Sequence, residues 1–176
     1  GGTTTIICFA AQERGAEFMP IVRGYHERAK QSCIDYSFHL IISDPNDKVI
    51  NEEVPQLIDE GHRSLKIFMT YPRNRLNDAE ILRVLDVAKR KQALVCVHAE
   101  NHDAIMYMTE KLLQAEKNST KHHAWCKPPL VEREATHRMI MLAELVDTPI
   151  QIFHVSCEEA AEEVDRARRR GLKVFS

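Results

Sequence analysis

Short apolar segments alternate with longer stretches of helical periodicity along the whole chain of 176 residues. Each short segment is rich in Val, Ile, Leu or Phe and is bounded by polar or turn residues, which is typical of a β-strand. Because these strands are apolar on both faces, we expect a parallel sheet that is covered by helices. The six predicted strands are Thr4–Phe9, Tyr36–Ile42, Ser64–Met69, Leu94–His98, Ile150–Val155 and Leu172–Phe175.

Helical periodicity fills the segments between these strands. The clearest helix begins with Asn77 as its N-cap and Glu80 three residues later, which is a capping-box arrangement. An apolar stripe and a basic last turn follow, as a helix that packs on a sheet requires. The other predicted helices are near Ala16–Lys30, Val49–Glu60 (interrupted by Pro55), Asp103–Lys117, Val131–Val146 and Glu158–Arg170, and the longest irregular stretch is Asn118–Pro129.

Six strand–helix units fit either a doubly wound sheet or part of an eightfold barrel. No GxGxxG or GxxxxGK[ST] motif follows any strand, so nothing favours a nucleotide-binding sheet. A complete TIM-like barrel usually needs about 250 residues. We therefore expect residues 1–176 to form a single α/β domain with about six of the eight βα units of such a barrel. The chain starts without Met and ends on a predicted strand, which suggests a fragment of a longer protein.

Composition excludes several classes of partner. The formal net charge is −2, from 24 Lys and Arg against 26 Asp and Glu, so neither nucleic acid nor an anionic membrane is expected as a partner. No apolar run approaches the roughly 20 residues that span a bilayer. The five cysteines are scattered and form no CxxC pair, which favours reduced thiols in a cytoplasmic protein.

Polar side chains lie in or at the ends of three predicted strands. Lys66 lies inside the third strand, and His98 and His154 end the fourth and fifth. Counting by two places His154 on the same face as Ile150 and Ile152. Catalysis in barrels occurs at the carboxyl ends of strands, and imidazole is the commonest nitrogen ligand of Zn²⁺. Taken singly, a strand-end histidine is more often structural than a ligand, and Lys66 also suits the Schiff-base amine of an aldolase.

Two motifs are specific when they occur together: the segment from Lys66 to Tyr71, Lys-Ile-Phe-Met-Thr-Tyr, and the segment from Val97 to Asn101, Val-His-Ala-Glu-Asn. With four further segments, they resemble the dihydropyrimidinase and D-hydantoinase family of the amidohydrolase superfamily along essentially the whole chain. This resemblance implies a metal-dependent hydrolase barrel. It also implies hydrolysis of a cyclic amide, a dihydropyrimidine or a hydantoin, to an N-carbamoyl amino acid. The further segments are Gly1–Ile7, Asp35–His39, Glu134–Thr136 and Phe153–Ser156.

The resemblance also implies roles for individual residues. Lys66 would carry a CO₂-derived carboxylate that bridges two divalent metal ions, usually zinc, with a metal-bridging hydroxide as nucleophile. His98 and His154 would ligate the second metal ion. Tyr71 would bind the substrate and donate a hydrogen bond to the oxyanion. The family's His-x-His pair would precede this chain, its catalytic Asp would follow it, and its members form tetramers. We therefore expect a homo-oligomer, and little or no activity from these residues alone.

Other interpretations remain open. A non-catalytic relative that acts as a scaffold would keep the fold, but such relatives typically lose metal ligands that are present here. An aldolase would form a borohydride-reducible adduct on Lys66. We interpret His39 as structural, and we expect Glu100 and Asn101 to order the loop after His98, with support of a metal ligand as a further possibility.

Overall fold

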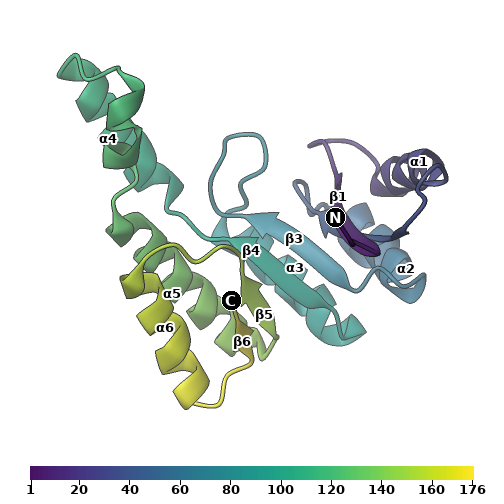
Figure 1. The fold of residues 1–176 in the computed structure, drawn as a ribbon. Coiled ribbons are helices and arrows are strands. Elements are labelled where there is room, and N and C mark those ends of the chain that lie inside the picture. The colour runs from purple at the N-terminus through teal and green to yellow at the C-terminus, as the bar shows by residue number, and fades with distance from the viewer.

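A computed structural model describes residues 1–176 and contains one six-stranded sheet with the strand order β1-β2-β3-β4-β5-β6 (Figure 1). Every neighbouring pair of strands is parallel, and helical segments connect successive strands, as in the βα units of a barrel. β1 and β6 are the two edges of the open sheet. The predicted α/β fold with about six βα units is confirmed. The strands are β1 (Thr5–Ala11), β2 (Asp35–Ile41), β3 (Ser64–Phe68), β4 (Leu94–His98), β5 (Ile150–Ile152) and β6 (Val174–Phe175).

Helices cover one face of the sheet and bury the core against it. A cluster of 33 buried hydrophobic residues includes Leu65, Ile67, Val95 and Val97 from the central strands. None of the helices is both long and apolar enough to cross a lipid bilayer. The helices are α1 (Phe18–Ala29), α2 (Val54–Asp59), α3 (Asp78–Lys91), α4 (His102–Gln114), α5 (Pro129–Val146) and α6 (Glu158–Arg169), with a π-helical turn at Val49–Glu53 and a 3₁₀ segment at Thr120–Cys126.

The capping box predicted at the start of α3 is present. The Asn77 side chain accepts a hydrogen bond from the Glu80 backbone N–H at 2.9 Å, and the Glu80 carboxylate accepts one from the Asn77 N–H at 2.8 Å. These two contacts satisfy two of the backbone donors that the first turn of a helix leaves free. The helix therefore begins where its sequence predicts.

Several predicted details differ from the observed elements. At Pro55 the helical segment changes type rather than ending, because the π-helical turn Val49–Glu53 runs directly into α2 and Glu53 keeps helical dihedrals. The stretch predicted as irregular contains the 3₁₀ segment. β5 ends at Ile152 rather than Val155, and His154 adopts a positive φ of 42°. His154 consequently does not share the buried face of Ile152, because the chain turns between them.

The segment from residue 102 to residue 126, which comprises α4 and the 3₁₀ segment, extends away from the sheet (Figure 1). We call this segment the arm. Its side chains Met106, Tyr107, Leu113 and Trp125 are exposed. The two ends of the arm lie close together beside the carboxyl end of β4, because the Asn101 N–H donates a hydrogen bond to the Val131 carbonyl at 3.0 Å.

Candidate functional site

Lys66 lies on β3 with its side chain on the face of the sheet opposite the helices. The residue is only 2% exposed, and its Nζ atom has no hydrogen-bond partner. Nζ lies 4.7 Å from the ring centroid of Phe68 and 4.4 Å from that of Phe153. Burial lowers the pKa of the Lys66 amine to about 8. Neutral amine is therefore far more accessible here than in a surface lysine, because desolvation disfavours the charged form.

His98 and His154 face each other at the carboxyl ends of β4 and β5. The distance from His98 Nδ1 to His154 Nε2 is 2.9 Å, and their ring centroids are 4.5 Å apart. Parallel register places His98 beside Phe68, two residues beyond Lys66. Burial lowers the pKa of His154, and the neighbouring His98 and Lys66 lower it further. The two imidazoles are thus held in contact near the buried amine.

Glu100 binds the other nitrogen of the His98 ring. His98 Nε2 lies 2.6 Å from Glu100 Oε2, and Lys127 Nζ donates a hydrogen bond to the same oxygen at 2.8 Å. Burial raises the pKa of Glu100, but the hydrogen bonds from His98 and Lys127 outweigh this effect and lower the pKa to about 2. An ionised carboxylate can only accept, so His98 Nε2 carries the proton and donates it. That tautomer leaves the lone pair on Nδ1, which faces His154.

Tyr71 lies three residues after the end of β3 and has a positive φ of 69°. Its ring centroid lies 5.0 Å from that of His98 and 5.9 Å from that of Phe68, and the side chain is 41% exposed. Lys127 Nζ lies 5.4 Å from the Tyr71 ring centroid. The phenol therefore lies at the open end of the site, beside the histidine pair.

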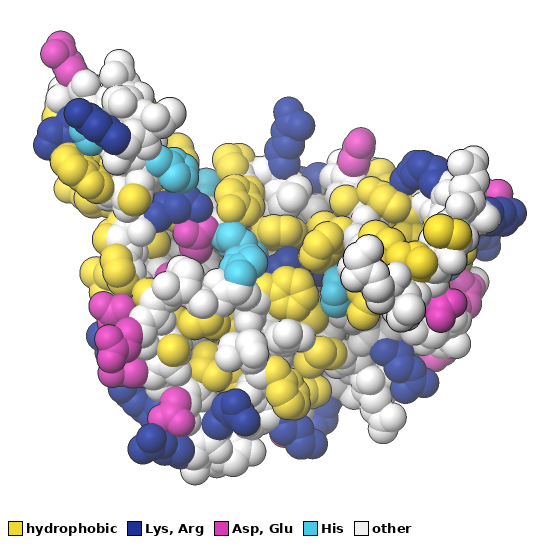
Figure 2. Space-filling model, in the orientation of Figure 1, with side chains coloured by type: hydrophobic (Ala, Val, Ile, Leu, Met, Phe, Trp, Pro, Cys, Tyr) yellow, Lys and Arg dark blue, Asp and Glu magenta, His cyan; other side chains and the backbone are white.

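A cavity of about 270 Å³ opens at this end of the sheet, and its walls include His98, His154, Glu100, Lys127 and Ser156. Figure 2 shows histidine side chains on this face between the arm and the rest of the molecule. The Ser156 N–H donates a hydrogen bond to Glu132 at 2.7 Å, which ties the loop after His154 to α5. The cavity thus contains ionisable groups from three separate segments of the chain.

The side chains at this end of the sheet fit part of a metal centre. No three His, Cys, Asp or Glu side chains of the chain are arranged to hold a metal ion. Two Zn–N bonds of about 2.0–2.1 Å at the tetrahedral angle place their nitrogens about 3.3 Å apart. His98 Nδ1 and His154 Nε2 lie at the 2.9 Å of a hydrogen bond, so a small separation of the two rings would let both nitrogens ligate one ion. The buried Lys66 amine has no hydrogen-bond partner, and a carboxylate on it would add oxygen ligands.

Comparison with known proteins agrees with this geometry. No protein-family model matches the chain. A D-hydantoinase of Ralstonia pickettii is 45% identical over 178 residues, which cover 100% of this chain and 39% of that protein. A solved D-hydantoinase structure superposes with a TM-score of 0.95 at 45% identity, covering 99% of this chain and 38% of its own. This chain belongs to the D-hydantoinase and dihydropyrimidinase family.

A dihydropyrimidinase structure from Brevibacillus agri gives a TM-score of 0.94 at 38% identity, over 99% of this hydantoinase-family chain and 38% of the solved chain. The chain spans about 39% of the length of the curated relatives it matches first. The six-stranded sheet therefore corresponds to part of a D-hydantoinase barrel.

The structure brings the four sequence-predicted residues of this hydantoinase-family chain to one end of the sheet: Lys66, Tyr71, His98 and His154. Their chemical roles remain predictions. His39 lies elsewhere on the sheet, where its Nδ1 is 2.5 Å from the Ser64 hydroxyl.

Sequence reasoning missed Lys127 and Phe153. Lys127 lies in a stretch without periodicity, and its partner Glu100 is distant in sequence. The only sequence signal was Glu100, an acidic residue two positions after the candidate ligand His98, which suggests that a cation such as Lys127 lies nearby. Phe153 was quoted only within a family motif, although its ring covers the Lys66 amine.

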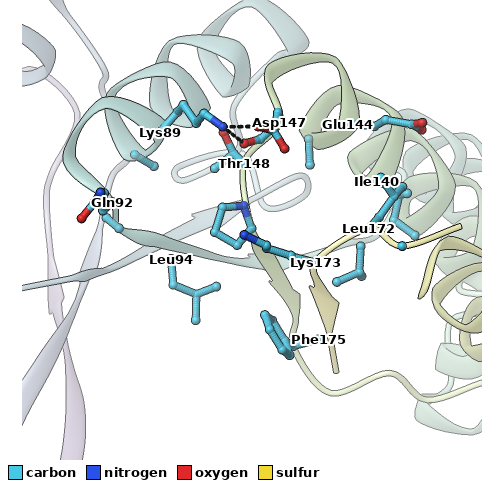
Figure 3. A pocket seen from close by; sticks show the side chains of 16 residues that line it. Lys89, Gln92, Leu94, Ile140, Glu144, Asp147, Thr148, Leu172, Lys173 and Phe175 are labelled. Carbon is cyan, nitrogen blue, oxygen red and sulfur yellow. Dashed lines mark hydrogen bonds and ion pairs between the residues drawn. The ribbon is translucent and has the colours of Figure 1, made fainter. Parts of the chain in front are cut away.

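A larger cavity, of about 610 Å³, lies at the amino ends of β4, β5 and β6 (Figure 3). Lys89 and Asp147 form an ion pair there, and Phe175 from the edge strand also lines the cavity. Barrel enzymes carry out their chemistry at the carboxyl ends of strands, so this cavity is on the wrong side of the hydantoinase-family sheet for catalysis.

Proposed function

We propose that the protein carrying this chain hydrolyses a cyclic amide, opening a dihydropyrimidine or 5-substituted hydantoin ring to an N-carbamoyl amino acid. The observation that carries the proposal is the pair formed by His98 Nδ1 and His154 Nε2, 2.9 Å apart, beside the buried amine of Lys66. The 45% identity to a D-hydantoinase supports the substrate class.

In this proposal, the neutral Lys66 amine would add to CO₂, forming an N–C bond and releasing one proton to solvent, and the resulting carboxylate would hold two divalent metal ions, with zinc as the expected metal. His98 and His154 would hold one of these ions. When bound, the ions supply a Lewis acid for the amide carbonyl and lower the pKa of water. The apolar rings of Phe68 and Phe153 favour the neutral amine, because they exclude water from around Nζ.

Tyr71 is assigned to the substrate carbonyl. Its ring lies beside His98 at the open end of the site, where a bound ring would lie against both residues. We expect the phenol to donate a hydrogen bond to the oxyanion that forms on the carbonyl oxygen. Loss of one such donor typically lowers kcat by about 10²–10³-fold.

The metal ligands are tested in the complete protein with Lys66→Ala. This variant should lose bound metal and ring-opening activity towards dihydrouracil and 5-substituted hydantoins, and a short carboxylic acid should restore part of both. Metal content is measured by atomic emission, and hydrolysis by loss of ring absorbance. Lys121→Met on the exposed arm serves as a matched lysine control. Unchanged metal content in Lys66→Ala would contradict the carboxylate assignment.

Hydrolysis, borohydride trapping and chelation together separate the alternative functions. A scaffold relative would show no hydrolysis in the metal-loaded protein. An aldolase would be trapped on Lys66 by borohydride with a carbonyl substrate, and would keep its activity after chelation.

Assembly into a homotetramer in the cytoplasm belongs to the same proposal. Exposed apolar side chains on β1, including Ile7 at 54% and Phe9 at 43% exposed, support assembly with further chain or with other copies. Light scattering of the complete protein measures the assembly, and a monodisperse monomer would contradict it.

A further inference from the structure

The arm leaves and rejoins the molecule at the histidine pair. Glu100 precedes the arm by two residues, and Lys127 follows it directly. The 2.8 Å hydrogen bond from Lys127 Nζ to Glu100 Oε2 therefore joins the two ends of the arm across 27 positions of sequence. The Asn101 side chain adds a second link, donating to Glu134 at 2.6 Å.

Lys127 differs from the lysines at the end of the arm. Its side chain is 25% exposed, its partner Glu100 is 15% exposed, and His98, which contacts the same carboxylate, is 12% exposed. Lys121, six residues earlier, is exposed and forms no ion pair. A surface lysine contributes little to structure, whereas a partly buried cation beside a partly buried carboxylate offsets a desolvation cost of that carboxylate.

We propose that Lys127 is a positioning residue of the candidate site: its ammonium group fixes the Glu100 carboxylate, and Glu100 in turn holds the His98 ring by Nε2–H so that Nδ1 faces His154. The role of Lys127 in hydrolysis rests on the proposed function, but its effect on the His98 ring does not.

The contacts from Lys127 to Glu100 and from Glu100 to His98 are physically coupled. One oxygen, Glu100 Oε2, accepts from both His98 and Lys127, so a shift of the carboxylate moves the imidazole as well. Lys127 Nζ also lies 5.4 Å from the Tyr71 ring centroid, which is within the range of a cation–π contact. Lys127 therefore contacts neighbours of the site on two sides without itself touching the histidine pair.

The test compares Lys127→Met, Lys127→Arg and the control Lys121→Met in the complete protein. Two quantities are measured: the dissociation constant for Zn²⁺ by competition with a chromophoric chelator, and the His98 tautomer in the metal-free protein by ¹⁵N NMR of the imidazole. Loss of a partner that orients a metal-binding histidine typically weakens metal affinity by about 10–100-fold. We expect that loss in Lys127→Met, together with a mixture of His98 tautomers, and near wild-type values in Lys127→Arg and Lys121→Met.

A double-mutant cycle with Glu100→Gln tests whether Lys127 acts through Glu100. If it does, adding Lys127→Met to Glu100→Gln should weaken zinc binding by no more than about twofold, because contacting residues are not additive. If Lys127→Met does not fold, Lys127→Gln takes its place. Zinc affinity and tautomer in Lys127→Met equal to those of Lys121→Met would overturn the proposal, as would fully additive losses.

Hydrolysis is measured separately, so the two proposals can fail independently. A lower kcat at unchanged KM in Lys127→Met, restored by Lys127→Arg, is expected if the complete protein hydrolyses cyclic amides. A zinc-loaded wild-type protein that opens no such ring would end the proposed function, and the tautomer and zinc measurements would still decide the role of Lys127.

Discussion

Lys66 carries an amine at a position where the rest of the strand interior is apolar. Its neighbours along β3, Leu65 and Ile67, are fully buried and face the helices, whereas Lys66 faces two aromatic rings. Because Nζ has no hydrogen-bond partner, the charged form is destabilised in the folded chain. Retaining such a group makes physical sense where the neutral amine is used in chemistry.

This burial predicts a pH-dependent gain in stability when Lys66 is replaced by Met. The folded pKa of about 8 lies below the unfolded value near 10.5, so the unfolded chain binds more protons between these limits. The burial cost, about 3 kcal/mol, is therefore fully present below pH 8 and disappears as pH rises to 10.5. Metal-free Lys66→Met, purged of CO₂, should have a higher free energy of unfolding than wild type at pH 7, and this difference should be smaller by about 3 kcal/mol above pH 10.5.

Chemical denaturation at several pH values measures this difference. Lys121→Met, on the exposed arm, should change the free energy of unfolding by less than about 0.5 kcal/mol at every pH. A less stable Lys66→Met variant at pH 7, or a difference from wild type that does not vary with pH, would contradict the argument.

The sequence alone identified the candidate site residues, but it did not identify the side chains that they contact. Lys66, His98 and His154 stand out because they are polar residues in or beside apolar strands. The Glu100–Lys127 pair could not be found in this way, since it depends on where a 25-residue arm returns to the sheet. His154 was assigned to the wrong face because counting by two fails once the chain leaves the strand.

The observed ends of helices and strands agree with the predicted ones where hydrogen bonds of nearby side chains define the end. Asn77 and Glu80 define the start of α3 because both hydrogen bonds of the capping box depend on these two side chains alone. The end of β5 has no such local signal. Val155 is β-branched and suits a strand, but the loop after β5 is tied to α5 through Glu132 and Ser156, which is a tertiary contact.

Removing the N-cap of α3 should destabilise the chain by a measurable amount. Asn77→Ala leaves the Glu80 N–H without its acceptor, and loss of such a cap costs about 1 kcal/mol. Thermal and chemical denaturation should show this decrease, while Asn77→Ser, which keeps a side-chain oxygen in reach, should stay close to wild type. Equal losses in the Ala and Ser variants would show that the side-chain oxygen is not what stabilises the helix.

The whole molecule is an open, curved layer rather than a closed ring. β1 and β6 each pair with one neighbour, so each presents a row of backbone N–H and C=O groups without a strand partner. Exposed Ile7 and Phe9 on β1 and Phe175 on β6 extend this unpaired surface. The number of βα units was predictable from the strand count, but the shape of these edges was not.

Residues 1–176 in isolation should therefore self-associate through β1. Ile7→Lys places a charge on an exposed apolar edge and should lower the average mass measured by light scattering. Leu145→Lys, on α5 in the helical layer and 77% exposed in wild type, is the matched control and should have a smaller effect. Equal effects of the two substitutions would point to general hydrophobic association instead of edge pairing.

The arm has a consequence for how this region tolerates insertions. Its two ends are fixed to each other at the base, and its outermost residues, 114 to 121, are all exposed. An insertion near Asn118 would lengthen the arm without separating the residues at its base. Insertions at exposed loop tips are generally tolerated for this reason. A guest domain or a fluorescent reporter inserted there is expected to leave the base of the arm, and the candidate site beside it, in place.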